Sequence, residues 1–179
     1  MSNDVKKYLI TALTLGLIAT GSALLIAGTN AVTRDTIAKN EVKQVNKGIS
    51  NIYGDGAKSV DEQEVKDSNH TYVTTQYVVN NSEDALCGYA FKTTGSNSYG
   101  KISLIVGFDN EYVYKNIFVV VNEQSFATTL NKKYLNRLIK KEIKLTDVSC
   151  GATYGAKLVR DMVDDATAFV EELKGANNG

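Results

Sequence analysis

An uncharged apolar segment near the N-terminus constrains the fold of this chain more than any other feature. From Tyr8 to Gly28 no residue is charged, and Leu, Ile and Ala alternate with Thr, Ser and Gly. A segment of this length is enough for one helix to cross a hydrocarbon core of roughly 30 Å. We therefore expect a short N-terminal segment over residues 1–7 and a transmembrane helix over residues 8–29.

A secretory signal peptide is the alternative interpretation of this segment. Lys6 and Lys7 precede the apolar run, and Thr29 and Ala31 place small residues at the outer positions of a possible cleavage site. The run is longer than the roughly 7–15 apolar residues usual in a signal peptide, which favours an uncleaved anchor. No cysteine directly follows the run, so a lipoprotein-type lipid attachment is not indicated.

The rest of the chain is long enough for one globular domain. The 179 residues are 43% hydrophobic, and 20 basic residues balance 20 acidic ones. Because a nucleic-acid-binding domain needs a strongly basic face, we expect no nucleic-acid partner. Residues 30–56 are only loosely periodic and end at two glycines, which predicts a helical or stalk-like connection. The domain is expected over residues 57–174, with a tail over residues 175–179.

Few residues suggest a metal site. Residues 57–70 are polar and predict a loop with one short element, and His70, the only histidine, is expected to be a solvated side chain beside it. Two cysteines and one histidine are too few for an ordinary structural zinc site, so no metal ligand is predicted. Cys87 and Cys150 could pair in an oxidising compartment, lie buried, or lie near a cofactor; we favour unpaired thiols.

The middle of the chain has the pattern of an antiparallel sheet. Four segments are rich in β-branched and aromatic residues, and clusters of Asn, Asp, Ser and Gly separate them. Short strands joined by short turns predict an antiparallel meander. The expected strands are residues 71–79, 87–94, 101–108 and 112–121.

Two amphipathic helices are expected after the sheet. Residues 131–142 carry apolar residues at helical spacing among several lysines, so the charged side chains form a solvated face or meet anionic lipid headgroups or an acidic protein partner. The last helix has an apolar stripe from Val159 to Leu173 that should pack on the sheet. The predicted fold class is therefore α+β, with one N-terminal transmembrane helix and an antiparallel sheet flanked by helices.

A turn of small residues leads into that last helix. Such a turn exposes backbone N–H groups at the positive end of the helix dipole, where a phosphate or carboxylate is favoured. Thr153 adds a hydroxyl group to these donors. The simpler interpretation is that Ser149 or Thr153 is the N-cap of the helix.

The turn also carries a motif. The string from Asp147 to Thr153 resembles the flavinylation motif Asp-x-x-(Ser/Thr)-Gly-Ala-Thr of the RnfG/NqrC family, whose members serve the Rnf electron transport complex and the sodium-pumping NADH:quinone reductase. Asp147, Gly151, Ala152 and Thr153 match, whereas Cys150 stands where the family usually has serine or threonine. The resemblance implies that FMN is attached covalently to Thr153 through a phosphoester bond.

The resemblance extends to the predicted sheet, which is similar to an FMN-binding domain from Gly88 onward. In relatives a loop reading Glu-Thr-Pro-Gly-Leu-Gly closes over the flavin, and here residues 123–128 stand in its place. Glu123 matches, and Gln124 and Thr128 are further candidate contacts. The Phe126 ring could cover part of the isoalloxazine, or this could be an ordinary solvated loop.

The resemblance implies an electron-carrying role, with no catalytic side chain. A threonine hydroxyl is a weak nucleophile, and no His or Cys base is adjacent in this segment, so a separate flavin transferase using FAD is the expected partner in maturation. The flavin would perform the redox chemistry. The implied whole is the Rnf complex, which passes electrons between ferredoxin and NAD while moving sodium ions or protons, with its other membrane subunits and membrane lipid as partners.

Two alternatives to a component of the Rnf complex are left open. One is the NqrC component of the sodium-pumping quinone reductase or another extracytoplasmic flavinylated electron-transfer protein. The other is a non-redox, membrane-anchored binding module in which the Gly-Ala-Thr turn only caps a helix. Lysines flank the apolar run on both sides and do not decide its orientation. The family resemblance implies that the flavin domain lies on the extracytoplasmic side of the cell membrane.

Overall fold

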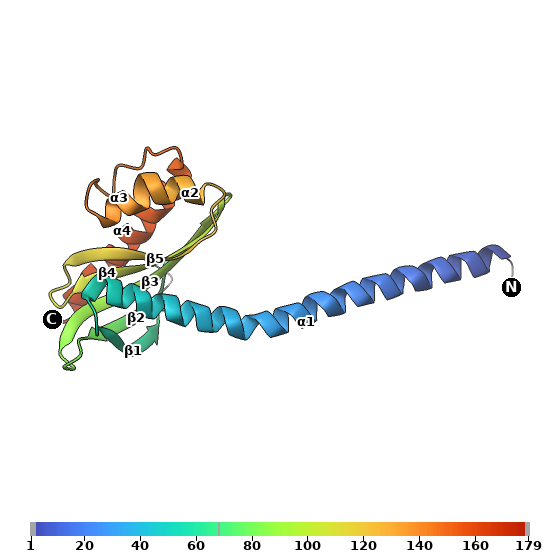
Figure 1. The fold of residues 1–179 in the computed structure, drawn as a ribbon, viewed down its shortest axis with the longest axis horizontal. Helices are drawn as coiled ribbons and strands as arrows, with labels where there is room; N and C mark the ends of the chain where they lie inside the picture. The colour runs from blue at the N-terminus through green and yellow to red at the C-terminus, as the bar shows by residue number, and fades with distance from the viewer. Residues whose placement is uncertain (1–2, 68, 178–179) are drawn as a thin grey trace. The chain divides into compact units, whose positions relative to one another are not determined.

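The computed structural model of the chain describes residues 3–67 and 69–177. They form two compact units, Met1–Val42 and Lys43–Gly179. A single helix, α1, begins in the first unit and ends in the second (Figure 1). The elements are α1 (Asn3–Tyr53), β1 (Lys58–Glu64), β2 (Val73–Asn80), β3 (Leu86–Asn97), β4 (Gly100–Asp109), β5 (Tyr114–Asn122), α2 (Ala127–Leu130), η1 (Asn131–Leu135), α3 (Asn136–Ile139) and α4 (Thr153–Asn177).

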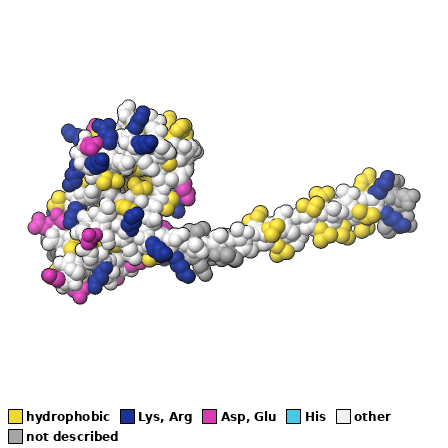
Figure 2. Space-filling model, viewed as in Figure 1, with side chains coloured by type: hydrophobic (Ala, Val, Ile, Leu, Met, Phe, Trp, Pro, Cys, Tyr) yellow, Lys and Arg dark blue, Asp and Glu magenta, His cyan; other side chains and the backbone are white. Residues whose placement is uncertain are grey.

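The first unit is the apolar part of α1. Val5–Thr29 is long and apolar enough to cross a membrane, with a mean hydropathy of 2.1, and none of its apolar window is buried. Figure 2 shows hydrophobic side chains distributed along it. The hydroxyl groups of Thr14 and Thr20 donate to carbonyl oxygens one turn earlier, at 2.8 Å each, so they need no water. The predicted apolar helix is confirmed, and it suits a single-pass anchor or a signal sequence.

The second unit is built on a five-stranded antiparallel sheet in the order β1-β2-β3-β4-β5. This confirms the predicted α+β class and the meander. The loop with one short element expected over residues 57–70 contains β1, a strand at the edge of the sheet. Its side chains are almost all exposed, and charged groups among them protect an edge strand from pairing with other chains.

One face of the sheet is covered by the end of α1. Val45, Ile49 and Ile52 are buried against Ile105 and other residues that point to this side of the sheet. The contact is close because the sheet has a glycine there: a Cβ at Gly107 would lie 2.6 Å from Ile52 Cγ2.

Tyr53 fastens this last turn of α1 to two strands. Its hydroxyl donates to the Tyr89 carbonyl oxygen at 2.6 Å and accepts from the Phe108 N–H at 3.1 Å. Burial of the phenol raises the pKa of Tyr53, so the hydroxyl stays protonated and keeps its donor. Residues 43–53 are therefore a covering helix of the domain.

The other face is covered by α4 and by the helical segment α2–η1–α3 (Figure 1). The predicted helix over residues 131–142 begins earlier, at Ala127, contains a π-helical turn over residues 131–135, and ends at Ile139. Its lysines are exposed, as expected for a solvated face. The α4 helix buries the predicted apolar stripe and continues to Asn177, through most of the segment expected to be a tail.

Two expectations about single residues need comment. The expectation that His70 is solvated is wrong, because only 5% of its surface is exposed. Ring contact with Phe169 of α4, at 5.1 Å between centroids, covers it. Cys87 and Cys150 are both free thiols. They pack against different hydrophobic clusters, on opposite faces of the sheet.

Candidate functional site

A cavity of about 250 Å³ lies at the N-terminal end of α4. Three segments meet there: the turn between β3 and β4, the loop after β5 that leads into α2, and the turn into α4. Its lining residues are Tyr99, Gln124, Phe126, Leu130, Gly151, Ala152, Thr153, Tyr154 and Gly155. Five of these are consecutive, so the turn into α4 forms most of one wall.

The local geometry places Thr153 at the start of α4. Gly151 has a φ of +81°, a left-handed conformation that glycine adopts without strain, and it turns the chain into the helix. The Ala156 N–H donates to the Ala152 carbonyl oxygen at 3.0 Å, so helical hydrogen bonding begins at Ala152. The amides of residues 153–155 precede the first helical donor, the Ala156 N–H, and the helix dipole makes this end positive. The half-buried Thr153 thus offers its hydroxyl in a setting that favours an anion.

Three aromatic rings stand around the cavity. Tyr99 and Tyr154 are stacked, with centroids 5.4 Å apart and planes 24° apart, and Phe126 lies 6.0 Å from Tyr99. Phe126 is 54% exposed and Tyr154 is 64% exposed. Exposed aromatic rings that gather at one place are suited to hold a flat conjugated ligand.

Gln124 holds the loop after β5 in place. Its side chain is buried, and Nε2 donates to the Gly100 carbonyl oxygen and to Asn97 Oδ1, the latter at 3.1 Å. Asn97 Nδ2 in turn donates to the Tyr154 carbonyl oxygen at 3.3 Å. These bonds join the β3–β4 turn, the loop and the first turn of α4, so the three walls of the cavity are held together.

Tyr134 fixes the segment that leads into the motif. Its buried side chain donates from the hydroxyl to the Leu145 carbonyl oxygen, and burial raises the pKa of Tyr134, so this donor persists at any ordinary pH. Asp147 closes the next turn, because its carboxylate accepts from the Lys144 N–H at 2.9 Å. The chain between α3 and α4 has no regular structure. These two contacts nevertheless hold it in place just before Gly151 turns it into α4.

A comparison with known protein families found a match at the N-terminal end of the chain, far in sequence from the cavity. Residues 1–52 match the family model described as the RnfG N-terminal region. Over these 52 of its 179 residues the chain is similar to the RnfG family. This match at the N-terminal end supports the family resemblance deduced from the motif at the other end of the chain. No curated protein matches the chain.

The match does not cover the cavity, whose role depends on the residues that line it. Four of the predicted site residues line it together: Gln124, Gly151, Ala152 and Thr153. The other four lie outside its lining, which follows from their surroundings. Glu123 and Thr128 are exposed, Cys150 is buried in the core beneath the turn, and Asp147 is exposed on the preceding turn.

Sequence reasoning did not assign Tyr99 and Tyr154 to the site. Each carried a signal that could have been used. Tyr99 is an aromatic residue in a turn of Gly, Ser and Asn residues, where small polar residues are usual, and Tyr154 directly follows the motif threonine. An aromatic residue placed in a turn or on an exposed helix start has no core to fill, which points to a ligand or a partner.

Proposed function

We propose that this chain is the electron-carrying, flavin-bearing component of the Rnf complex, with FMN attached to Thr153 through a phosphoester bond. The observation that carries the proposal is the position of the Thr153 hydroxyl, at the N-terminus of α4 and in a cavity walled by three aromatic rings. A phosphoryl group on Thr153 would lie at the positive end of the helix dipole, close to the backbone N–H groups of the first turn.

The cavity fits a flavin held by one covalent bond. The rings of Tyr99, Phe126 and Tyr154 would contact the isoalloxazine, and Gln124 and Gly151 would keep the walls and the turn in position. A volume of about 250 Å³ is smaller than the roughly 300–1,000 Å³ of sites that enclose a ligand. The flavin would therefore be partly exposed, as an electron carrier that meets partner proteins requires.

The protein's own residues supply position and electrostatics. Bound FMN supplies transfer of electrons one or two at a time, and a covalent bond keeps it from being lost. Among the residues that line the cavity none is a general base for the Thr153 hydroxyl, so attachment would need a separate flavin transferase. Asp147 is exposed beside the turn and is the residue we assign to docking with that enzyme.

The proposed location rests on the apolar helix and, for the side of the membrane, on the family resemblance. We infer that Val5–Thr29 stays in the cell membrane, in contact with lipid and the other Rnf proteins, and that the domain lies on the extracytoplasmic side. A cofactor that dissociates outside the cell is lost to the surrounding medium, and covalent attachment would prevent this loss. The NqrC component of the sodium-pumping quinone reductase would use the same site, so the identity of the complex is a question for co-purification of the partners.

The test is covalent flavin on the full-length chain produced in membranes together with a flavin transferase. The wild type is expected to fluoresce in a denaturing gel and to gain the mass of one FMN on the peptide containing Thr153. T153A is expected to lose both signals completely, and T128A, which changes an exposed threonine outside the cavity, is expected to keep them.

Two results would count against the proposal. Flavin that stays on T153A after denaturation would assign the attachment to another residue. A wild-type chain that stays unmodified beside an active transferase would make the cavity the site of a non-redox binding module.

A further inference from the structure

A second group of polar residues lies at the far end of α4, away from the cavity. His70 precedes β2, and its side chain is only 4% exposed. His70 Nδ1 lies 3.0 Å from Asp165 Oδ1, and Asp165 Oδ2 accepts from the Tyr72 and Val73 N–H groups at 2.8 and 3.3 Å. An ionised carboxylate can only accept, so the proton of the neutral imidazole is on Nδ1 and the lone pair is on Nε2.

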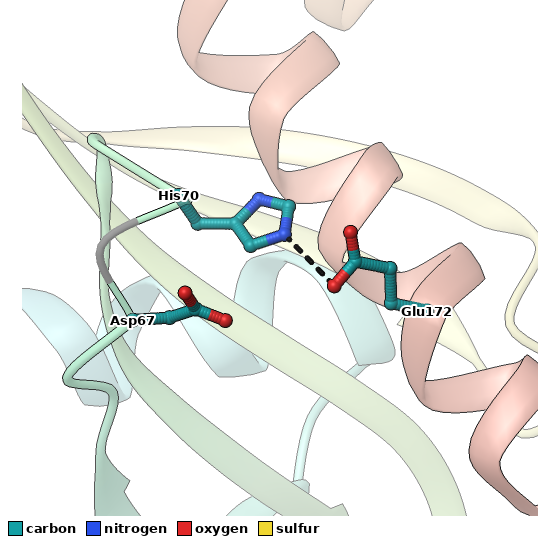
Figure 3. A group of neighbouring side chains, drawn as sticks. All are labelled: Asp67, His70 and Glu172. Carbon is teal, nitrogen blue, oxygen red and sulfur yellow. Dashed lines mark ion pairs between the residues drawn. The ribbon is translucent and has the colours of Figure 1, made fainter.

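Two more carboxylates lie close to the Nε2 edge of the His70 ring. Among residues 3–67 and 69–177, buried Nε2 has no hydrogen-bond partner. Glu172 Oε2 comes within ion-pair distance of it, at 3.4 Å, without hydrogen-bond alignment. Asp67 lies on the other side of the ring edge (Figure 3), and the ligand atoms of Asp67, His70 and Glu172 are all within 4.8 Å of one another. A buried acceptor facing two carboxylates lacks a positive group between them.

We propose that Asp67, His70 and Glu172 bind a divalent transition-metal cation of the Zn²⁺ class, with water completing its coordination. An imidazole nitrogen with carboxylate oxygens is a ligand set that Zn²⁺ accepts, whereas Mg²⁺ and Ca²⁺ take oxygen ligands. Asp165 would orient the ligand histidine from behind, since a metal-bound histidine usually donates its other N–H to a carboxylate.

The ligands need only a small movement to reach bonding distance. Tetrahedral ligands at about 2.0–2.1 Å from zinc are about 3.4 Å apart, compared with the 4.8 Å spread here. Glu172 Oε2 is already 3.4 Å from Nε2, so the longer separation involves Asp67, and Glu172 can also adjust because 62% of its side chain is exposed. His70 itself is fixed by Asp165 and by the edge contact with Phe169. One oxygen of Asp67 accepts from the Asn69 N–H at 2.8 Å, which leaves its other oxygen for the ion.

The ion would have a structural role. It would tie the segment before β2 to the C-terminal half of α4, two parts of the chain about a hundred residues apart in sequence. Glu172 is roughly 28 Å along the helix from Thr153 at about 1.5 Å per residue, too far to take part in chemistry at the cavity. The expected effect is a more stable α4, the helix that begins at Thr153.

A second proton on His70 would compete with the metal ion for Nε2. Burial lowers the pKa of His70, but Asp165 and Glu172 outweigh this and raise it above 6.5. A doubly protonated His70 held between Asp165 and Glu172 is therefore the state that the experiment has to distinguish from a bound cation.

The experiment uses the full-length chain in detergent, produced without a transferase so that no flavin phosphate can bind the metal. After treatment with a chelator, ZnCl₂ is titrated calorimetrically and bound zinc is measured by mass spectrometry. We expect one zinc per wild-type chain and at least about tenfold weaker binding in D67N and in E172Q. E171Q removes a charge from the neighbouring exposed residue of the same helix and is expected to bind like the wild type.

A second readout identifies the ligands. Zinc should raise the unfolding midpoint of the wild type and E171Q, because it binds the folded state, and should not raise that of E172Q. The proposal would be overturned if the wild type bound no zinc, or if E172Q and D67N bound zinc as tightly as the wild type does. So would ¹⁵N NMR that finds both His70 nitrogens protonated with zinc in excess. None of these outcomes affects the proposed function, since flavin attachment is measured separately.

Discussion

The two ends of α4 are built in opposite ways. At the N-terminal end, Thr153 and Tyr154 line an open cavity, and the aromatic rings around it are exposed. Toward the C-terminal end, Asp165 and Phe169 close over a buried histidine, and the polar atoms face inward. At the N-terminal end the aromatic side chains stay accessible to a partner. At the other end Asp165 bonds to groups of the protein itself.

The helix between them connects the two ends rigidly. The inner face of α4 is buried against the sheet, in the largest hydrophobic cluster of the domain. This face includes Ala156, Val159, Met162, Val163 and Ala166. Burial of such residues contributes about 1.5–3 kcal/mol for each large side chain. The two ends share a rigid helix but no side chain, so variants at one end can be compared with variants at the other.

The largest effect on stability is expected at the closed end, from D165N. The amide group would place a donor against the His70 ring N–H or a backbone N–H, leaving buried donors unpaired. We expect a loss of about 3 kcal/mol in the free energy of unfolding. D164N changes the adjacent residue, which is exposed and whose pKa is already raised by partial burial, so its loss should stay within about 0.5 kcal/mol. Urea unfolding followed by circular dichroism would compare the two, and equal stabilities would contradict the importance of the closed end.

An intermediate effect is expected at the open end, from G100A. Gly100 has a φ of +130°, and a Cβ there would collide with the Glu123 carbonyl oxygen. The strain should cost about 2 kcal/mol and should displace the loop that Gln124 holds against Gly100. Because Thr153 is untouched, covalent flavin should remain but become more accessible. Iodide quenching of flavin fluorescence would measure this, with S98A in the same exposed turn as the control; unchanged quenching would mean that the loop does not cover the flavin.

The same contrast explains how much of the site could be predicted from the sequence. The open end is formed largely by consecutive residues, so Gly151, Ala152 and Thr153 could be recognised as one motif, and the apolar stripe of α4 shows where the helix follows. The strands were predictable for a similar reason, since β4 contains a continuous run of buried residues that are mostly apolar.

The closed end could not be predicted, because its parts are far apart in the sequence. His70 follows a polar loop, and only the fold brings Asp165 to it from α4. The edge strand β1 was not assigned for another reason: it pairs with β2 through its backbone while its charged side chains stay exposed, so no apolar alternation marks it. Local patterns identify elements, whereas buried polar partners emerge only from packing.

The smallest effect on stability is expected from C150S, at the junction of the motif and the core. Cys150 is 9% exposed and packs in the cluster beneath α4, where a thiol behaves as a small apolar group. Serine restores the residue that the family usually has, but it buries a hydroxyl, and we expect a loss of about 1 kcal/mol. Covalent flavin should be unchanged, because Cys150 does not line the cavity. Mass spectrometry would measure the covalent flavin of C150S, and unfolding would measure its stability, with C87S as the control for both. Loss of flavin in C150S alone would mean that the sulfur takes part in presenting Thr153, and the functional end of α4 would then extend into the core.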